Sequence, residues 1–132
     1  MSWFLPGTPS VKSTAATATN PTTATIIAEL TSTGHSTSAG FGMQSGDAPK
    51  QVQVSAFLGT STQATAWWLE HVLSTGIGST AIKSRRVLIT PSGATSQFVV
   101  KYDLVLGDRI RVRVSAAFTG SADGYLDGEV IS

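Results

Sequence analysis

Apolar and polar residues alternate with a period of two along most of the chain after Thr25, a pattern typical of β-strands with one buried face. The segment 51–58 shows this most clearly, because valine, alanine and leucine occupy the even positions and glutamine or serine occupies most odd ones. Clusters of Gly, Pro and Ser separate the alternating segments and indicate turns. Strands are accordingly predicted at 26–31, 51–58, 64–73, 87–89, 96–106, 110–118 and 125–131.

The segment 64–73 is compatible with a strand or with a short helix. We favour a strand, because the segment is rich in threonine and aromatic residues and is followed by turn clusters at 74–76 and 78–79. Neighbours on a strand point to opposite faces, so Trp67 and Trp68 are expected to face opposite ways. The outward tryptophan needs cover from a second sheet, the N-terminal segment or another subunit, and Trp68 is our candidate for this contact.

The region 96–118 predicts a hairpin, because it contains two alternating segments joined by a short polar stretch. A two-residue turn would send the apolar face of one strand outward while the face of its partner points inward. A three-residue loop places both apolar faces on the same side of the sheet. We therefore predict a three-residue loop, either at 107–109 or at 106–108.

Antiparallel strands of this length predict an all-β fold, namely an antiparallel β-sandwich or jelly roll with an extended N-terminal arm. Residues 25–132 are expected to form the single β-sandwich domain. Residues 1–24 are predicted as a flexible arm, because Ser, Thr, Ala and Pro dominate them. Such a segment has too little apolar surface to offset the conformational entropy lost on ordering.

The tip of the arm is apolar, with Trp3, Phe4 and Leu5 in succession. Large side chains on a tether are most strongly stabilised when they enter a pocket on a partner, so we predict these three as partner-binding residues. The alternative is that they fold back onto their own domain.

A glycine-rich gap at 32–50 is a second candidate contact segment. Loops of this length are usually functional or disordered. The residues in it that we predict to bind a partner are Phe41 and Met43.

Composition and charge exclude several classes of function. The chain of 132 residues carries 9 Lys and Arg against 8 Asp and Glu, and a net charge of +1 argues against a dedicated nucleic-acid binder. It contains no cysteine, which excludes disulfides, thiolate nucleophiles and cysteine-ligated metals. The first apolar run is shorter than that of a signal peptide, and no stretch approaches the length of a membrane span. We expect a soluble protein made in the cytoplasm, with no membrane partner.

Candidate catalytic chemistry is sparse. The eight acidic residues are scattered, several of them in predicted turns, and no pair stands out for acid–base catalysis. His35 falls in the glycine-rich gap and His71 in a predicted strand, neither with the spacing of a metal site. No Gly-x-Ser-x-Gly motif accompanies the many serines. We therefore expect no enzyme activity, no cofactor and no metal site.

Basic residues are better organised than acidic ones. Alternate positions of one predicted strand carry arginine, which lines one of its faces with positive charge. The residues are Arg109, Arg111 and Arg113, with Lys101 on the paired strand and Arg85 and Arg86 as possible neighbours. Such a stripe could meet an acidic protein surface, or it could be a solvated outer face partly balanced by Asp103. Docking to a partner protein is favoured over nucleic acid, because no exposed aromatic residues are interleaved with the charges.

Several segments together resemble the small jelly-roll cement, or decoration, proteins on the capsids of tailed bacteriophages. The segments are the apolar-tipped arm at 1–25, Trp68-Leu69-Glu70-His71 followed by Leu73-Ser74-Thr75-Gly76, the strand from Val87 to Pro91, and the Leu104 to Val114 region around Leu-Gly-Asp. The resemblance covers most of residues 25–131. It implies a structural protein made in the host cytoplasm that binds the major capsid protein on the outer surface of the virion and bridges neighbouring capsomers. It also implies self-association, with a homodimer favoured and a trimer as the alternative, and no catalytic residues.

Two other functions stay open. One is a tail or neck component of a virion, which would differ from a decoration protein mainly in copy number and location. The other is a carbohydrate-binding β-sandwich, in which the outward tryptophan of the 67–68 pair stacks on a sugar.

Overall fold

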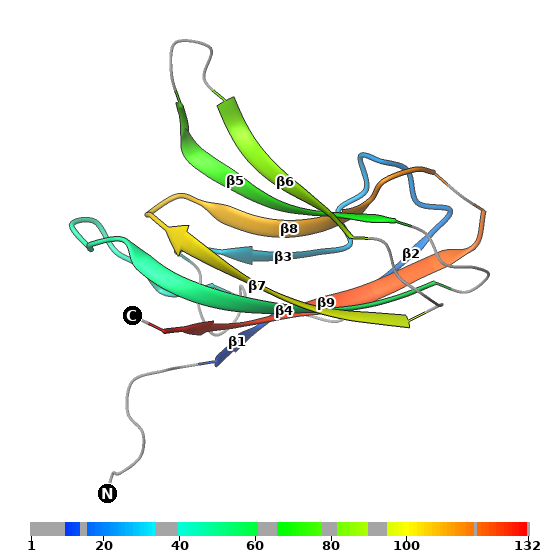
Figure 1. Cartoon of the computed structure of the whole chain (residues 1–132), viewed down its shortest axis with the longest axis horizontal. Coiled ribbons are helices and arrows are strands. Elements are labelled where there is room, and N and C mark those ends of the chain that lie inside the picture. The colour runs from blue at the N-terminus through cyan, green and yellow to red at the C-terminus, as the bar shows by residue number, and fades with distance from the viewer. Residues whose placement is uncertain are drawn as a thin grey trace, which may run out of the picture.

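Two antiparallel β-sheets pack face to face in the computed structural model of the chain (Figure 1). The structure describes residues 10–13, 16–33, 40–60, 66–77, 82–89, 95–117 and 119–131. The regular elements in these ranges are all strands. The predicted all-β class and the β-sandwich are therefore confirmed.

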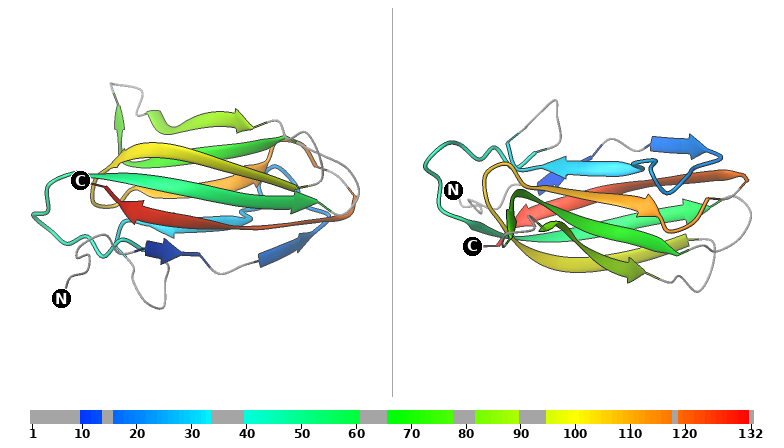
Figure 2. Two further views of the ribbon diagram at one scale, coloured as in Figure 1. Left: turned by 60° about the horizontal axis from the view of Figure 1, so that its bottom comes forward. Right: turned by 90° about the horizontal axis from the view of Figure 1, so that it is seen from above.

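Each sheet combines strands that are distant in the sequence. Sheet A contains β1 (Ser10–Lys12), β2 (Ala16–Thr19), β4 (Lys50–Thr60), β7 (Thr95–Leu104) and β9 (Ser121–Val130). Its order is β1-β9-β4-β7, and β2 follows β1 along the same edge of β9 (Figure 2). Sheet B contains β3 (Ala28–Thr31), β5 (Trp67–Ile77), β6 (Ile82–Ile89) and β8 (Arg109–Val114), in the order β3-β8-β5-β6.

The connection between β7 and β8 shows that the predicted hairpin is wrong. The two strands are consecutive in the chain, but β7 pairs with β4 in sheet A and β8 pairs with β3 and β5 in sheet B. A tight turn makes the crossing: the Asp108 N–H donates to the Val105 carbonyl oxygen at 3.0 Å, and Gly107 adopts the φ of 96° that such a turn requires. The alternation correctly marks the inner face of each strand, but it carries no information on which sheet the strand joins.

Residues 10–12 and 16–19 are more ordered than their composition predicts. β1 and β2 fall within the predicted arm 1–24, yet both pair with β9, and Val11 and Ala18 pack against the core. The open edge of β9 offers backbone partners to any segment with free N–H and C=O groups, whatever its side chains. The sandwich therefore includes β1 and β2, which lie before residue 25.

Buried Ser13 joins the two short strands to β9. The pairing with β9 shifts by one residue between β1 and β2. At this shift the Ser13 N–H donates to the Leu126 carbonyl oxygen and Ser13 Oγ accepts from the Leu126 N–H, both at 2.8 Å. The contact prediction for Trp3, Phe4 and Leu5 falls outside the described residues and stays a prediction.

The core lies between the two sheets and is closed at one end by residues 40–43. Phe41 and Met43, the two candidate contact residues of the glycine-rich gap, are both buried in this core. Backbone hydrogen bonds hold them there, because the Phe41 N–H donates to the Thr31 carbonyl at 3.0 Å and the Met43 N–H to the Ser32 carbonyl at 2.8 Å. In this fold both side chains pack inside the domain instead of lying on its surface.

Gly128 of β9 makes room for Phe41 in the core. A Cβ atom on Gly128 would lie 2.6 Å from Phe41 Cζ and 3.0 Å from Leu30 Cδ1. We expect Gly128→Ala to lower the free energy of unfolding by about 2 kcal/mol, because the added methyl displaces buried side chains. Urea denaturation measures this change.

Two further variants test the reason for this loss. Glu129→Ala alters the exposed neighbour of Gly128 and should change the stability by less than about 0.5 kcal/mol. In a Phe41→Leu background the smaller side chain leaves space for the methyl, so Gly128→Ala should cost less there than in the native chain. Equal costs in the two backgrounds would contradict the contact as the cause.

Candidate functional site

Strand alternation in sheet B brings charged residues together on its outer face. Trp67, Leu69 and His71 of β5 are buried, while Trp68 and Glu70 take the opposite face of the strand. Trp67 lies in the core and Trp68 is half-buried, so the predicted opposite orientation of the two tryptophans is confirmed.

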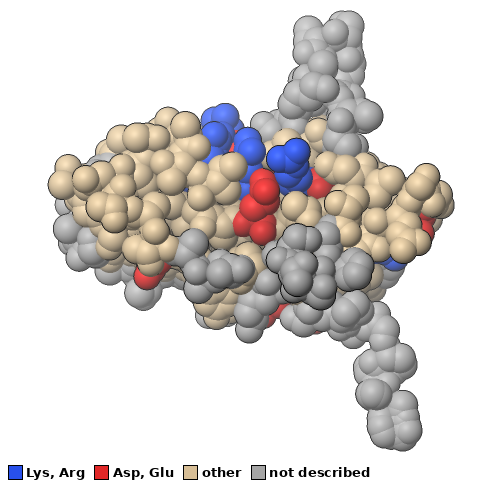
Figure 3. Space-filling model, turned by 180° about the vertical axis from the view of Figure 1, so that it is seen from behind, with Lys and Arg blue, Asp and Glu red and all other residues tan. Residues whose placement is uncertain are grey.

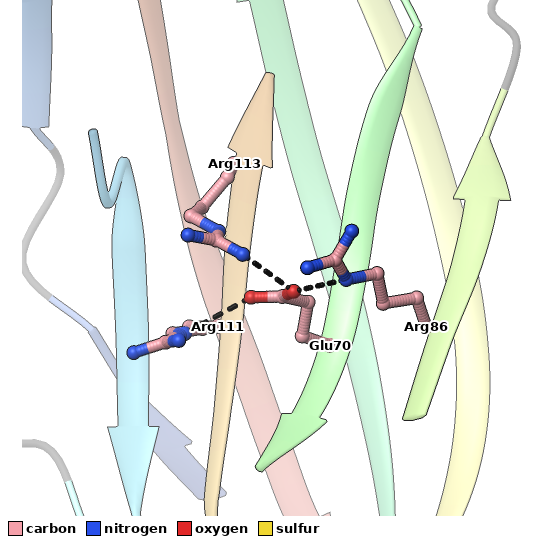
Figure 4. Close-up of polar contacts among 4 residues, drawn as sticks. All are labelled: Glu70, Arg86, Arg111 and Arg113. Atoms are coloured by element: carbon pink, nitrogen blue, oxygen red, sulfur yellow. Dashed lines mark hydrogen bonds and ion pairs between the residues drawn. The ribbon is translucent and has the colours of Figure 1, made fainter. Parts of the chain in front are cut away.

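Glu70 lies at the centre of this charged group. In register it stands between Arg111 of β8 and Arg86 of β6. Arg113 lies two residues further along β8 and so shares the face of Arg111. The set of Glu70, Arg86, Arg111 and Arg113 is called the Glu70 cluster below. Figure 4 shows the three arginines of this cluster, from two strands, pointing toward the one carboxylate.

Each arginine contacts an oxygen of Glu70. Arg111 Nε donates to Oε1 at 3.0 Å, and Arg113 Nη2 donates to Oε2 at 2.7 Å. Arg86 Nε forms an ion pair with Oε2 at 2.7 Å. The glutamate side chain is 0% exposed, whereas Arg86, Arg111 and Arg113 are 46%, 21% and 17% exposed. The guanidinium groups thus cover the carboxylate while remaining partly in contact with solvent.

The electrostatics of the cluster favour the ionised glutamate. Burial of Glu70 opposes ionisation, but the hydrogen bonds and positive charges of Arg113 and Arg111 outweigh it and hold the pKa of Glu70 below its ordinary value. Three arginines for one carboxylate leave the cluster with excess positive charge. Glu29 of β3 stands in register with Arg111 and offsets part of it. Figure 3 shows a face on which Lys and Arg atoms gather in one group, with Asp and Glu atoms beside them.

A pocket of about 340 Å³ lies next to the cluster and is called the Trp68 pocket below. It is lined by Thr23, Ala24, Trp68, Arg86, Arg113 and Ser115. On one side the Arg86 guanidinium carbon lies 5.3 Å from the centroid of the Trp68 ring, a cation–π distance. On another side Thr23 and Ala24 belong to a turn held by the Thr25 N–H, which donates to the Thr22 carbonyl at 3.0 Å. Part of the cover that an outward tryptophan needs therefore comes from the chain itself.

The predicted basic stripe is only partly brought together. Arg111 and Arg113 converge on Glu70, whereas Arg109 is exposed at the start of β8. Lys101 lies on β7 in the other sheet. Asp103, expected to balance the stripe, pairs in register with Gln51 of sheet A instead. The side chain of Arg85 lies outside the described residues.

Sequence reasoning missed Glu70 as the partner of the arginines and left Arg86 only as a possible neighbour. Alternation along β5 does place Glu70 on the outer face together with Trp68, so part of the signal was present. The arginines that bind Glu70 from β8 are 41 and 43 residues away in the chain. Only the pairing of β5 with β8, which alternation does not specify, brings them together.

A second polar group is buried inside the sandwich. His71 Nε2 lies 2.8 Å from Asp108 Oδ2, and the two side chains are 1% and 2% exposed. The Tyr102 ring meets the His71 ring edge to face, with 5.2 Å between their centroids. The group thus links β5 of sheet B to β7 of sheet A and to the turn between β7 and β8. Both side chains are therefore closed off from solvent between the two sheets.

The described residues hold no group of three His, Cys, Asp or Glu placed to bind a metal ion. In the same part of the chain there is no helix long and apolar enough to cross a membrane. A scan against protein-family models gives no match, and a search of curated proteins finds none similar to this chain.

Proposed function

We propose that the protein is a jelly-roll decoration protein that binds the outside of a phage capsid and stabilises it by bridging capsid subunits. One observation carries the proposal, namely the nested order of the strand pairs. β1 and β2 pair with β9, β3 with β8, β4 with β7, and β5 with β6. Winding one long antiparallel ribbon into two sheets would produce this order, which supports a jelly roll. The order agrees with the fold that the sequence resemblance implies.

The outer face of sheet B supports docking to an acidic protein surface. It presents the Glu70 cluster, in which each arginine remains partly exposed. The contacts with Glu70 fix the positions of these arginines, so they form a rigid surface for a contact of this kind. The partner that we propose is the major capsid protein.

Self-association, with a homodimer favoured, is part of the same proposal. β6 and β7 end the two sheets on one side of the sandwich (Figure 2). Val87 and Leu88 on β6 and Val99 on β7 are exposed apolar residues on these edge strands. Val87 stands in register with buried Leu69 and so faces the space between the sheets, whereas Leu88 and Val99 point to the outer faces. A second copy that covers this side would bury Val87 and protect the unpaired edges.

The mechanism is cross-linking by repeated weak contacts. An oligomer that binds one capsid subunit holds its other sites at high effective concentration next to neighbouring subunits. Interfaces of low individual affinity are then sufficient to stabilise the shell. An N-terminal anchor formed by Trp3, Phe4 and Leu5 would add one such contact per copy.

The copy number on purified particles tests the proposal. We expect quantitative mass spectrometry to give a simple fraction of the copy number of the major shell protein, because a decoration protein repeats over the whole surface. Particles that carry the protein should also release their DNA at a higher temperature than particles stripped of it, and adding the purified protein back should restore the difference. A handful of copies per particle would indicate the neck or tail instead, and absence from particles would overturn the proposal.

The carbohydrate-binding alternative receives less support from the structure. A sugar that stacks on Trp68 needs an open face of the indole ring. The Arg86 guanidinium lies over that ring at 5.3 Å from its centroid. The cation therefore competes with a sugar for the indole.

A further inference from the structure

The Trp68 pocket combines positive charge with an aromatic side chain in its lining. Arg86 and Arg113 line it from β6 and β8, and the indole of Trp68 lies between these strands on β5. Thr23 and Ser115 add residues with hydroxyl groups to the lining. Its volume of about 340 Å³ is near the small end of the range typical of ligand sites, which suits a side chain or a small molecule.

The arginines of the pocket have N–H donors that do not bind Glu70. A guanidinium carries five N–H donors, and Arg113 contacts Glu70 through Nη2. Among the described residues Arg113 Nε has no hydrogen-bond partner although the atom is buried. Because this atom is buried, a ligand in the pocket would meet the remaining guanidinium N–H groups of Arg86 and Arg113, which also require an acceptor. The group required beside Arg113 is therefore a hydrogen-bond acceptor.

The charge of the surrounding face favours a singly charged acceptor. Three arginines stand in one region of sheet B with two carboxylates, those of Glu70 and Glu29. Among these five side chains one positive charge is left over, which a single carboxylate neutralises. Inorganic phosphate near neutral pH carries more negative charge than this excess. The fork of a guanidinium also matches the two oxygens of a carboxylate.

We propose that the Trp68 pocket binds a carboxylate, and that its occupant is an Asp or Glu side chain of the protein to which this chain docks. The identity of the partner as a capsid shell protein rests on the proposed function, but the affinity of the pocket for carboxylates does not. The acidic side chain inserts beside Arg86 and Arg113 on the outer face of sheet B. Each docked copy thereby gains a directional contact in addition to general charge attraction.

The pocket itself is tested without any particle, by NMR. The indole N–H signal of Trp68 is assigned as the one that disappears in Trp68→Phe. We expect this signal to shift saturably on titration with the capped tripeptide Gly-Glu-Gly and much less with the matched tripeptide Gly-Gln-Gly at equal ionic strength. Equal shifts with the two peptides would overturn carboxylate binding. A tighter response to inorganic phosphate would overturn the choice of a carboxylate over other anions.

The partner is tested by binding of the folded protein to stripped particles. Ser115→Glu places a carboxylate of the chain itself in the pocket lining and leaves all four members of the Glu70 cluster in place. We expect it to bind about tenfold more weakly than the native chain, as does Arg86→Gln, which removes a partly exposed cation of the pocket. Lys101→Gln makes the same charge change on sheet A and should bind like the native chain.

The two experiments distinguish binding of a carboxylate by the pocket from docking of the protein to particles. If the native chain does not bind particles, the proposed function fails, while the peptide titration still decides whether the pocket takes a carboxylate. If the native chain binds and Ser115→Glu, with an unchanged unfolding midpoint, binds equally well, the partner side chain does not occupy this pocket. Weak binding by Lys101→Gln would likewise show that net charge and not the pocket controls docking.

Discussion

Glu70→Gln is expected to lower the free energy of unfolding by about 3 kcal/mol, because it removes the charge that three arginines share. The glutamate is fully buried beneath Arg86, Arg111 and Arg113, so its replacement leaves three guanidinium groups close together without their counter-charge. The amide of glutamine also presents an NH₂ group where one carboxylate oxygen accepted hydrogen bonds. Partial exposure of the arginines to solvent keeps the loss below that of a fully buried ion pair.

Urea denaturation at neutral pH measures the loss. The control is Glu129→Gln, which makes the same chemical change at an exposed position of β9 and should shift the stability by less than about 0.5 kcal/mol. Similar unfolding midpoints for the two variants would show that the Glu70 cluster adds nothing to stability.

The stability difference between native chain and Glu70→Gln should depend on pH in a defined direction. The folded state holds the pKa of Glu70 below its ordinary value of 4.5. The carboxylate therefore contributes its full share of stability above that ordinary value. The contribution falls as the pH drops from there through the lower pKa of the folded state, because the unfolded chain takes up the proton first. A difference that stays constant over this acid range would contradict the assigned role of the charge.

The strands were largely predictable because their signal is local. Alternation between inward and outward positions depends only on neighbours along one strand, and it correctly predicted that Trp67 and Trp68 face opposite ways. The sheet to which a strand belongs depends on its partners, which lie far away in the chain. β7 and β8 illustrate the limit, since each has a correct inner face and the predicted pairing between them is wrong.

β1 and β2 differ from the predicted arm for a related reason. Their Ser, Thr and Ala composition lacks the apolar surface that would order them alone. Order in β1 and β2 comes instead from the free edge of β9, through backbone groups that every residue type except proline possesses in full. Composition predicts whether a segment is ordered in isolation. Pairing with an open sheet edge orders a segment that would not be ordered alone.

Alternation along the strands predicted part of the candidate site, and the rest depended on which strands pair. Arg111 and Arg113 were assigned to one outer face from their spacing alone, and the structure places them there. Glu70 was on the correct face of its own strand, but its role required the register that sets it opposite Arg111. Phe41 and Met43 were chosen as contact residues because their segment is long and rich in glycine. Both are apolar, however, and they pack into the core at one end of the sandwich.

His71 and Asp108 show a nonlocal contact that no spacing rule suggests. The sequence placed His71 in a strand and Asp108 in a turn, each with ordinary surroundings. In the fold Asp108 accepts the Val105 N–H at 3.1 Å through the same oxygen that lies 2.8 Å from His71 Nε2. Its backbone carbonyl also accepts the Ser32 N–H at 3.0 Å. Asp108 thus connects the turn between β7 and β8 to β5 and to the end of β3.

Asp108→Ala is expected to lower the free energy of unfolding by about 4 kcal/mol, because it removes one member of a buried polar pair and loosens the turn that connects the sheets. Asp108→Asn keeps an oxygen for the Val105 N–H and the shape of the side chain, so its loss should be smaller. Asp103→Ala serves as the control, since it deletes an exposed carboxylate from the adjacent strand. Thermal and urea unfolding of the three variants provide the comparison. If Asp108→Ala unfolded at the same midpoint as Asp103→Ala, the link between His71 and Asp108 would have no part in holding the two sheets together.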